Sequence, residues 1–209
     1  MEATSIAQTR RERKERTRQA ILDAALRLLD EEAFGQLSLR QIAREVGMVP
    51  TAFYRHFSSL EELGLTLVDE SFSTLREMIR AARDDMGAYE SVIRRSVQVL
   101  VDHVHAHRSH FSFVARERFG GNAAVRGAIH RELELFSHEL ATDLTRLPNL
   151  RSWRPEDMQM LSDLIVNAMV STAMLLLTVE DPEDERRLVR DARKQLRLIV
   201  VGISGWQPR

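Results

Sequence analysis

The sequence predicts an all-α protein of about nine helices, and three observations support this fold class. Apolar residues recur at the three- and four-residue spacing of an α-helix along almost the whole chain. No stretch of useful length alternates apolar and polar residues as a half-buried β-strand does. Glycine and proline are sparse, with 9 and 5 among 209 residues, so the chain has few breaks. Its length allows one large or two small helical domains.

The predicted helices follow one another with short connections. The first covers about residues 12–32, and two short helices, at about 38–46 and 50–57, flank a glycine turn. A long fourth helix begins near Ser59 and continues to about residue 85. After a break at a glycine, five more are predicted, at about residues 90–107, 109–119, 122–146, 155–179 and 182–203. A proline opens each of the last two, as is typical of a first helical turn.

The segment SLRQIAREVGMVPTAFYRHF, residues 38–57, has the pattern of a helix-turn-helix. Ser38 and Gln41 fit a capping box at the start of the first helix. Gly47 can end that helix in the left-handed conformation, and Pro50 suits the first turn of the second helix. The second helix carries hydroxyl, phenol, guanidinium and imidazole groups, whereas the alternative, a buried helical hairpin, rarely does. We therefore expect this helix to enter the major groove of DNA.

Basic residues are concentrated near the N-terminus. Between residues 10 and 18, six Lys and Arg stand against two Glu. Such an arm can reach phosphates or a neighbouring minor groove, and the alternative is a solvated, partly disordered tail. Beyond residue 57 there are 20 Lys and Arg against 23 Asp and Glu, a net charge of −3. This asymmetry predicts a DNA-binding domain at residues 1–57 and a body at residues 58–209 with another task.

Several function classes are excluded or disfavoured. The chain has no cysteine, so it has no disulfide, thiol nucleophile or cysteine-ligated zinc. It shows no phosphate loop, nucleophile elbow, metalloprotease motif or paired-carboxylate signature, and we expect no enzyme and no cofactor. The N-terminal segment lacks the apolar core of a signal peptide, which predicts a cytoplasmic protein.

Three histidines, His103, His107 and His110, fall on one face of a predicted helix. They could bind zinc or nickel. A helix end near Ser109 would spoil that spacing, so surface or capping histidines are the favoured interpretation, and no metal is expected.

The segment LSDLIVNAMVSTAMLLLTV, residues 161–179, is apolar nearly all round. After Asp163 only 16 residues remain before Glu180, whereas a membrane span needs about 20 predominantly apolar residues. The pattern therefore favours a helix buried on several sides rather than a membrane partner. We expect this helix and the last one to form a four-helix bundle across the two-fold axis of a homodimer.

Residues 18–63, RQAILDAALRLLDEEAFGQLSLRQIAREVGMVPTAFYRHFSSLEEL, resemble the TetR family of bacterial transcriptional regulators. The resemblance implies a homodimeric repressor with an N-terminal three-helix DNA head, a palindromic double-stranded operator, and a C-terminal ligand-binding and dimerisation domain. Tyr54 and His56 match family residues that hold phosphates. Leu60 stands where the family usually has a lysine, which puts the phosphate contact made there in doubt. The candidate DNA-binding residues are Arg16, Arg18, Arg40, Gln41, Thr51, Ala52, Tyr54, Arg55 and His56.

The body resembles a narrower branch, the FabR- and DesT-like repressors of unsaturated fatty-acid synthesis. This rests on TAFYRHF, on ELGLTLVDES (62–71) and on RERFGGNAAVRGAIHRE (116–132). The resemblance implies control of fatty-acid desaturation or lipid metabolism by long-chain acyl thioesters such as acyl-CoA. An acyl chain needs an apolar tunnel with a polar or cationic end. The candidate ligand-binding residues are Phe72, Leu75, Ile79, Val104, Phe111, Phe113, Arg116, Phe119, Phe136 and Met169.

The ligand assignment has alternatives. Each apolar candidate is also explained as plain core, and Arg116 as a structural salt bridge with Glu117 or another helix. Two other functions stay open, namely a repressor of a drug-efflux pump that senses hydrophobic compounds, and an acyl or lipid carrier without DNA function.

Overall fold

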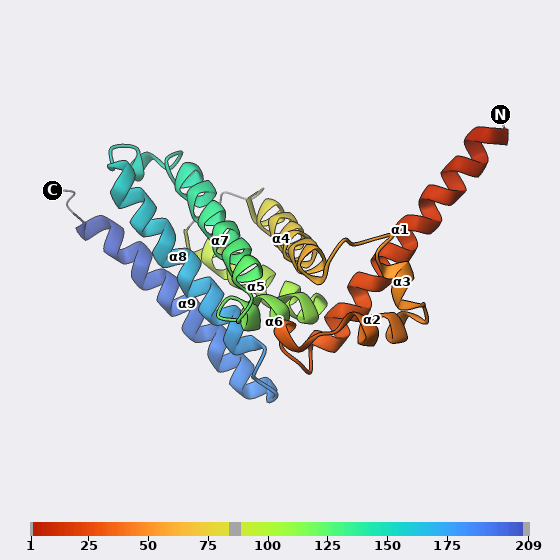
Figure 1. Ribbon diagram of the computed structural model, residues 1–209. Helices are drawn as coiled ribbons and strands as arrows, with labels where there is room; N and C mark the ends of the chain where they lie inside the picture. The colour runs from red at the N-terminus through yellow and green to blue at the C-terminus, as the bar shows by residue number, and fades with distance from the viewer. Residues whose placement is uncertain (1, 84–88, 207–209) are drawn as a thin grey trace. The chain divides into compact units, whose positions relative to one another are not determined.

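The computed structural model describes residues 2–83 and 89–206, with side chains at 11–73, 75–76 and 91–206. Over these residues the fold contains nine α-helices, two short 3₁₀ turns (Phe34–Gln36 and Pro148–Leu150) and no strand (Figure 1). The all-α prediction is confirmed. The helices are α1 Glu2–Leu29, α2 Leu39–Val46, α3 Pro50–Phe53, α4 Leu60–Arg83, α5 Tyr89–Ala106, α6 Arg108–Glu117, α7 Ala123–Leu144, α8 Pro155–Leu176 and α9 Pro182–Gly205.

α1 and α3 differ most in length from the prediction. α1 begins at Glu2, so the basic residues between 10 and 18 lie on a helix and not on a tail. Arg, Lys, Glu and Gln have high helix propensity, which explains why this polar segment is helical although it has no apolar periodicity. α3 ends at Phe53, but turns continue its path, since the Phe57 N–H donates to the Phe53 carbonyl at 3.1 Å.

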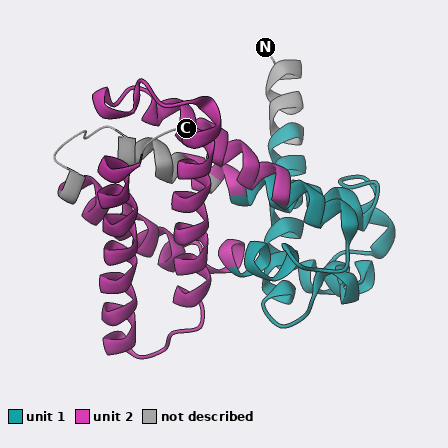
Figure 2. Cartoon of the chain, turned by 90° about the vertical axis from the view of Figure 1, so that its left-hand side faces the viewer, with its two compact units in different colours: residues 1–71, 112–129 teal, residues 72–111, 130–209 magenta. Residues whose placement is uncertain are grey.

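The chain divides into two compact units, coloured in Figure 2. Unit 1 contains residues 1–71 and 112–129, and unit 2 contains residues 72–111 and 130–209. The packing unit around the helix-turn-helix is thus larger than residues 1–57, because the start of α4, the end of α6 and the start of α7 belong to it. α4, α6 and α7 contribute residues to both units.

The core of unit 1 holds the short α3 in place. Ile21, Leu22 and Ile42 are buried on α1 and α2, as the helical period predicts. Phe53 and Phe57 are buried with them, and their rings lie 5.6 Å apart between centroids. Burying each such side chain contributes about 1.5–3 kcal/mol. Because an isolated helix of this length is unstable in water, this packing is what maintains α3.

The end of α6 is bonded to the end of α1 within unit 1. The Arg116 guanidinium donates to the carbonyl oxygens of Leu29 at 2.7 Å, Asp30 at 3.0 Å and Glu32 at 2.9 Å. The last carbonyls of a helix have no intrahelical partner, so a cation that bonds to them caps the helix. Arg116 is therefore a cap of α1.

Glu117, the next residue, is a buried carboxylate. Its Oε1 accepts a hydrogen bond from the Phe34 N–H at 2.9 Å, so it satisfies a backbone donor in the turn that follows α1. Gly120 lies against the same carboxylate, and any side chain there would collide with Glu117. The turn after α6 therefore needs a glycine at position 120 to make room for the Glu117 carboxylate.

We expect Glu117→Ala to lower the free energy of unfolding by about 2–3 kcal/mol, because it leaves the Phe34 N–H buried without an acceptor. Urea unfolding at one fixed protein concentration measures the change. Glu117→Gln keeps an acceptor and should cost less. Glu134→Ala, at an exposed position of α7, serves as the control and should stay within about 0.5 kcal/mol of the parent protein. Equal losses for Glu117→Ala and the control would contradict this role.

Unit 2 is built around α5, α8 and α9, and α8 and α9 lie side by side along most of their length (Figure 1). One core cluster joins α5, α6 and α8, and a second joins α5 and α9. The first contains Leu100, Val101, Val104, Phe111, Ala173 and Leu176, and the second Ile93, Val97, Ala192 and Leu196.

Among the described helices, α8 is long and apolar enough to cross a membrane by length and composition alone. Only 28% of its most apolar stretch is buried inside the chain. Core helices of soluble proteins pass the same test, so the feature is weak evidence for a membrane. Most of this apolar stretch is therefore not buried by the chain itself.

Candidate functional site

The helix-turn-helix has the local geometry that its sequence predicts. The Ser38 N–H donates to Gln41 Oε1 at 2.8 Å, and Ser38 Oγ accepts from the Gln41 N–H at 3.3 Å, which is a capping box. Gly47 ends α2 with a φ of +74°, in the left-handed region that favours glycine. Pro50 occupies the first turn of α3. Gln41 also donates to Glu32 at 3.1 Å, so its amide bonds within unit 1.

The exposed side of α3 carries the polar groups that the sequence singles out. Thr51 and Arg55 are exposed, and Tyr54 is 61% exposed. Ala52 is half-buried beside the buried Phe53. A short helix with a hydroxyl, a phenol and a guanidinium facing solvent can donate hydrogen bonds to phosphates and to base edges.

Arg18 links α1 to the segment after α3 and to α4. Its Nη1 donates to the His56 carbonyl at 2.6 Å, and its Nη2 donates to Thr66 Oγ1 on α4 at 3.2 Å. Its guanidinium carbon lies 4.0 Å from the centre of the Phe57 ring. A guanidinium can make these three contacts at once because it is planar and carries donors on several nitrogens. Arg18 thus positions the segment that follows α3.

His56 is half-buried next to several cations. Its Nδ1 is enclosed and has no hydrogen-bond partner. Burial lowers the pKa of His56 below 6.5, the positive charges of Lys14, Arg18 and Arg55 lower it further, and Glu15 opposes them. Burial and the neighbouring cations therefore both disfavour the protonated imidazole.

The start of α4 is capped by its own serines. Ser59 Oγ accepts from the Glu62 N–H at 3.0 Å, and the Ser58 hydroxyl and N–H both donate to Glu62 Oε2 at 2.6 Å. These two hydrogen bonds lower the pKa of Glu62. Leu60 lies half-buried at this helix start and offers no charge.

The remaining predicted DNA-binding residues are exposed arginines. Arg16 lies on α1 and Arg40 on α2. Lys14, whose charge acts on His56, is not among the predicted DNA-binding residues, because a count of charges treats it like its basic neighbours. The available signal is its spacing of four from Arg18, which places both on one face of a helix.

Two family models match this chain. One, described as bacterial regulatory proteins of the tetR family, matches residues 21–65, which include the helix-turn-helix. The other, described as a Tetracyclin repressor-like C-terminal domain, matches residues 89–202, more than half of the chain. The chain belongs to the TetR family. Its members are DNA-binding transcriptional regulators, and the match to residues 21–65 includes α2 and α3 of this TetR-family protein.

Solved structures share the TetR fold over most of their length. A TetR-like transcriptional regulator from Rhodococcus sp. RHA1 has a TM-score of 0.69 and 19% identity, covering 89% of this chain and 96% of its own. FadR from Bacillus subtilis, in complex with stearoyl-CoA, has a TM-score of 0.67 and 16% identity, with coverage of 90% and 99%. AibR, in complex with isovaleryl coenzyme A and operator DNA, has a TM-score of 0.65 and 14% identity, with coverage of 85% and 96%.

The predicted ligand-binding residues of this TetR-family chain are divided between the two units. In unit 2, Leu75 and Met169 pack against the cluster that contains Val104 and Phe111. Phe72 and Phe136 stack with ring centroids 5.5 Å apart. These residues from α4, α5, α6, α7 and α8 all belong to unit 2, as one cluster and one stacked pair. The side chain of Ile79 lies outside the described residues.

Three predicted ligand residues lie in unit 1. Phe113 is buried, with its ring 6.4 Å from that of Phe34. Phe119 is 72% exposed, with the Arg118 guanidinium 4.8 Å from its ring centre. Arg116 caps α1 through backbone carbonyls, which differs from the ion pair with Glu117 considered as its structural alternative. Hydrophobicity alone did not distinguish these positions from those in unit 2.

The histidines are close but do not share one helix. α5 ends at Ala106, so His110 lies on α6. The rings of His103 and His107 are 5.1 Å apart, and those of His107 and His110 are 6.4 Å apart. Among the side chains described, at residues 11–73, 75–76 and 91–206, no three from His, Asp and Glu are grouped so that they could hold a metal ion.

Proposed function

We propose that this TetR-family protein is a ligand-responsive repressor that binds a palindromic operator as a homodimer. The observation that carries the proposal is the exposed face of α3, on which Thr51, Tyr54 and Arg55 project from a helix fixed by buried aromatic rings and by Arg18. A two-fold dimer would present two such helices to successive major grooves, so its operator should be a palindrome. A regulator of this kind works in the cytoplasm, where the DNA is.

The dimer is proposed from α8 and α9. α8 exposes Met160, Leu164 and Leu175, which recur at helical spacing on one side. α9 exposes Leu198 and Val201, and nothing lies within 4 Å of a side chain added at Gly202 or Gly205, so a partner helix could approach closely there. An isologous contact between two such faces would form a four-helix bundle.

We infer that the effector is hydrophobic, and that a long-chain acyl thioester such as acyl-CoA is the best candidate. The apolar cluster around Val104 and Phe111 in unit 2 supports this, because Met169 at its side can adapt to different ligand shapes. FadR with stearoyl-CoA and AibR with isovaleryl coenzyme A share the fold, which makes an acyl-CoA compatible with it. The regulated genes would then serve fatty-acid desaturation or lipid metabolism, as in FabR- and DesT-like repressors.

α6 offers a route from effector to DNA. Its first residues belong to unit 2 and its last residues, through Arg116 and Glu117, are bonded to the end of α1. An effector that favours one position of α6 would favour one arrangement of the DNA-binding element, and DNA would reciprocally change effector affinity.

We expect Thr51→Ala and Tyr54→Phe each to weaken DNA binding about tenfold or more, because a hydrogen bond to a charged phosphate contributes about 1.5–3 kcal/mol. The probe is a labelled duplex from the region upstream of the protein's own gene, followed by fluorescence anisotropy at fixed salt. Thr145→Ala, at an exposed position beyond α7, should bind as the parent protein does. Unchanged binding for both α3 variants would show that α3 does not contact DNA, and no binding by any variant would favour a lipid carrier.

The effector class needs its own experiment. Native mass spectrometry of the protein purified from its host should reveal a dimer carrying an acyl thioester. A bound hydrophobic drug-like compound would instead favour an efflux-pump repressor. Adding a long-chain acyl-CoA to the anisotropy assay then shows whether the effector releases or strengthens DNA binding.

A further inference from the structure

We propose that Lys14, on α1, joins Arg55 and His56 in a single binding site for one backbone phosphate of DNA. This inference rests on the proposed DNA-binding function and adds to it a residue from the N-terminal helix. Arg18 is the positioning residue of the site.

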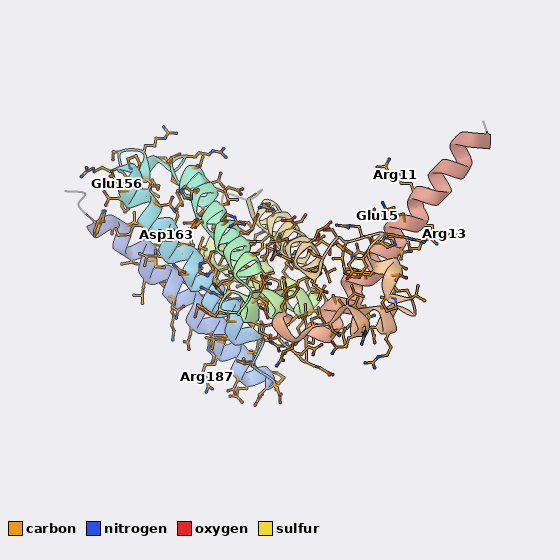
Figure 3. The ribbon with its side chains drawn as sticks, in the orientation of Figure 1. Arg11, Arg13, Glu15, Glu156, Asp163 and Arg187 are labelled. Carbon is orange, nitrogen blue, oxygen red and sulfur yellow. The ribbon has the colours of Figure 1, made fainter. Side chains whose placement is uncertain are left out.

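The geometry begins with the contact between α1 and the end of α3. Arg18 reaches the His56 carbonyl at 2.6 Å, so its face of α1 lies against His56. Lys14 precedes Arg18 by four residues, which is about one helical turn, and therefore lies on the same face. Figure 3 shows Arg11 and Glu15 on one side of α1 and Arg13 on the other, so side chains of this segment project from more than one side of the helix.

The charge of Lys14 acts directly on the imidazole of His56. Among the neighbouring charges it lowers the pKa of His56 most, ahead of Arg18 and of the adjacent Arg55. Glu15 acts on the imidazole in the opposite sense, and Leu60 at the start of α4 contributes no charge.

Three cations, Lys14, Arg18 and Arg55, therefore disfavour a positive charge on the half-buried imidazole, and Glu15 opposes them. Arg18 is held by its bonds to the His56 carbonyl and to Thr66, whereas Lys14 and Arg55 have exposed side chains. A phosphate between them would gain charge-assisted hydrogen bonds and would relieve the repulsion between the cations. An extended anion such as the DNA backbone fits because Tyr54 lies next to the same site and is exposed.

The chain allows an internally controlled test, because it contains two lysines, Lys14 and Lys194. Lys194 lies on α9 with its side chain 75% exposed. The full-length protein is acetylated with and without a saturating duplex from its own upstream region, and both sites are quantified by mass spectrometry. We expect the duplex to slow acetylation of Lys14 at least about fivefold and that of Lys194 less than twofold. Binding of the duplex is confirmed by anisotropy in the same samples.

The outcomes separate this inference from the proposed function. If the duplex binds and Lys14 reacts as fast as before, the phosphate site is wrong and DNA binding stands. If no duplex binds, the DNA-binding function fails, and this site fails with it.

Lys14→Gln provides a second readout. Each phosphate contact that is removed should reduce the slope of log K against log salt by about one. Arg151→Gln removes the same charge from an exposed position in unit 2 and should leave the slope unchanged. A Lys14→Gln protein that melts normally and keeps the parent slope would overturn the proposal.

Discussion

Replacing Arg18 by alanine is expected to weaken DNA binding at least about tenfold and to lower the free energy of unfolding by about 2–4 kcal/mol. The variant loses the hydrogen bonds to the His56 carbonyl and to Thr66, together with the stacking on the Phe57 ring. These contacts hold the end of the DNA-binding helix against α1 and α4. Urea unfolding and fluorescence anisotropy with the upstream duplex, both at fixed protein concentration and salt, measure the two effects.

Arg18→Lys distinguishes positioning from simple charge. A lysine keeps the positive charge but cannot bond two separate acceptors while it stacks flat on an aromatic ring. We therefore expect most of the stability loss and most of the binding loss to remain. If Arg18→Lys binds DNA as the parent protein does, Arg18 acts as a charge near the phosphates and not through the geometry of His56.

The helix-turn-helix was predictable because its signals are local. A capping box needs only Ser38 and Gln41, and a left-handed helix end needs only Gly47, so three- and four-residue patterns suffice. The polar part of α1 gave no such signal, since it has no apolar face to produce a period. The two 3₁₀ turns were missed for a related reason, because a single turn is too short to show a period.

The contacts between distant residues could not be predicted from spacing. Arg18 meets a carbonyl 38 residues away, and Arg116 one 87 residues away. Charge alone therefore assigned Arg18 to DNA and Arg116 to the acyl ligand. In the structure, Arg116 donates to backbone carbonyls, and Arg18 donates to a backbone carbonyl and a threonine hydroxyl. The sequence could not separate pocket residues from core residues among the aromatic ligand candidates either, because a phenylalanine that lines a pocket and one that fills a core have the same hydrophobicity. Phe113 and Phe72 are the same residue type, yet Phe113 on α6 belongs to unit 1 and Phe72 on α4 belongs to unit 2.

Placing a carboxylate at Leu198 is expected to dissociate the proposed dimer and to abolish tight operator binding. Leu198 is 72% exposed and lies with Val201 on the face of α9 that we assign to the partner subunit. Because both subunits of a two-fold dimer carry the substitution, it would place two carboxylates in the interface and remove two leucines that are buried there. Since burying one leucine contributes about 1.5–3 kcal/mol, we expect Leu198→Asp to raise the dimer dissociation constant at least about a hundredfold. Analytical ultracentrifugation over a range of concentrations measures this constant.

DNA binding should fail in the same variant for a reason unrelated to α3. A dimer binds both half-sites of a palindrome at once, and the second half-site is engaged at a high effective concentration. A monomer loses this gain, so its affinity for the upstream duplex should fall toward that for a single half-site. Leu135→Asp, which makes the same change at a half-exposed position of α7, should leave both the dimer and its DNA affinity intact. If Leu198→Asp remains dimeric and Leu135→Asp becomes monomeric, α7 and not α9 forms the subunit interface, and the exposed face of α8 and α9 must have a different partner.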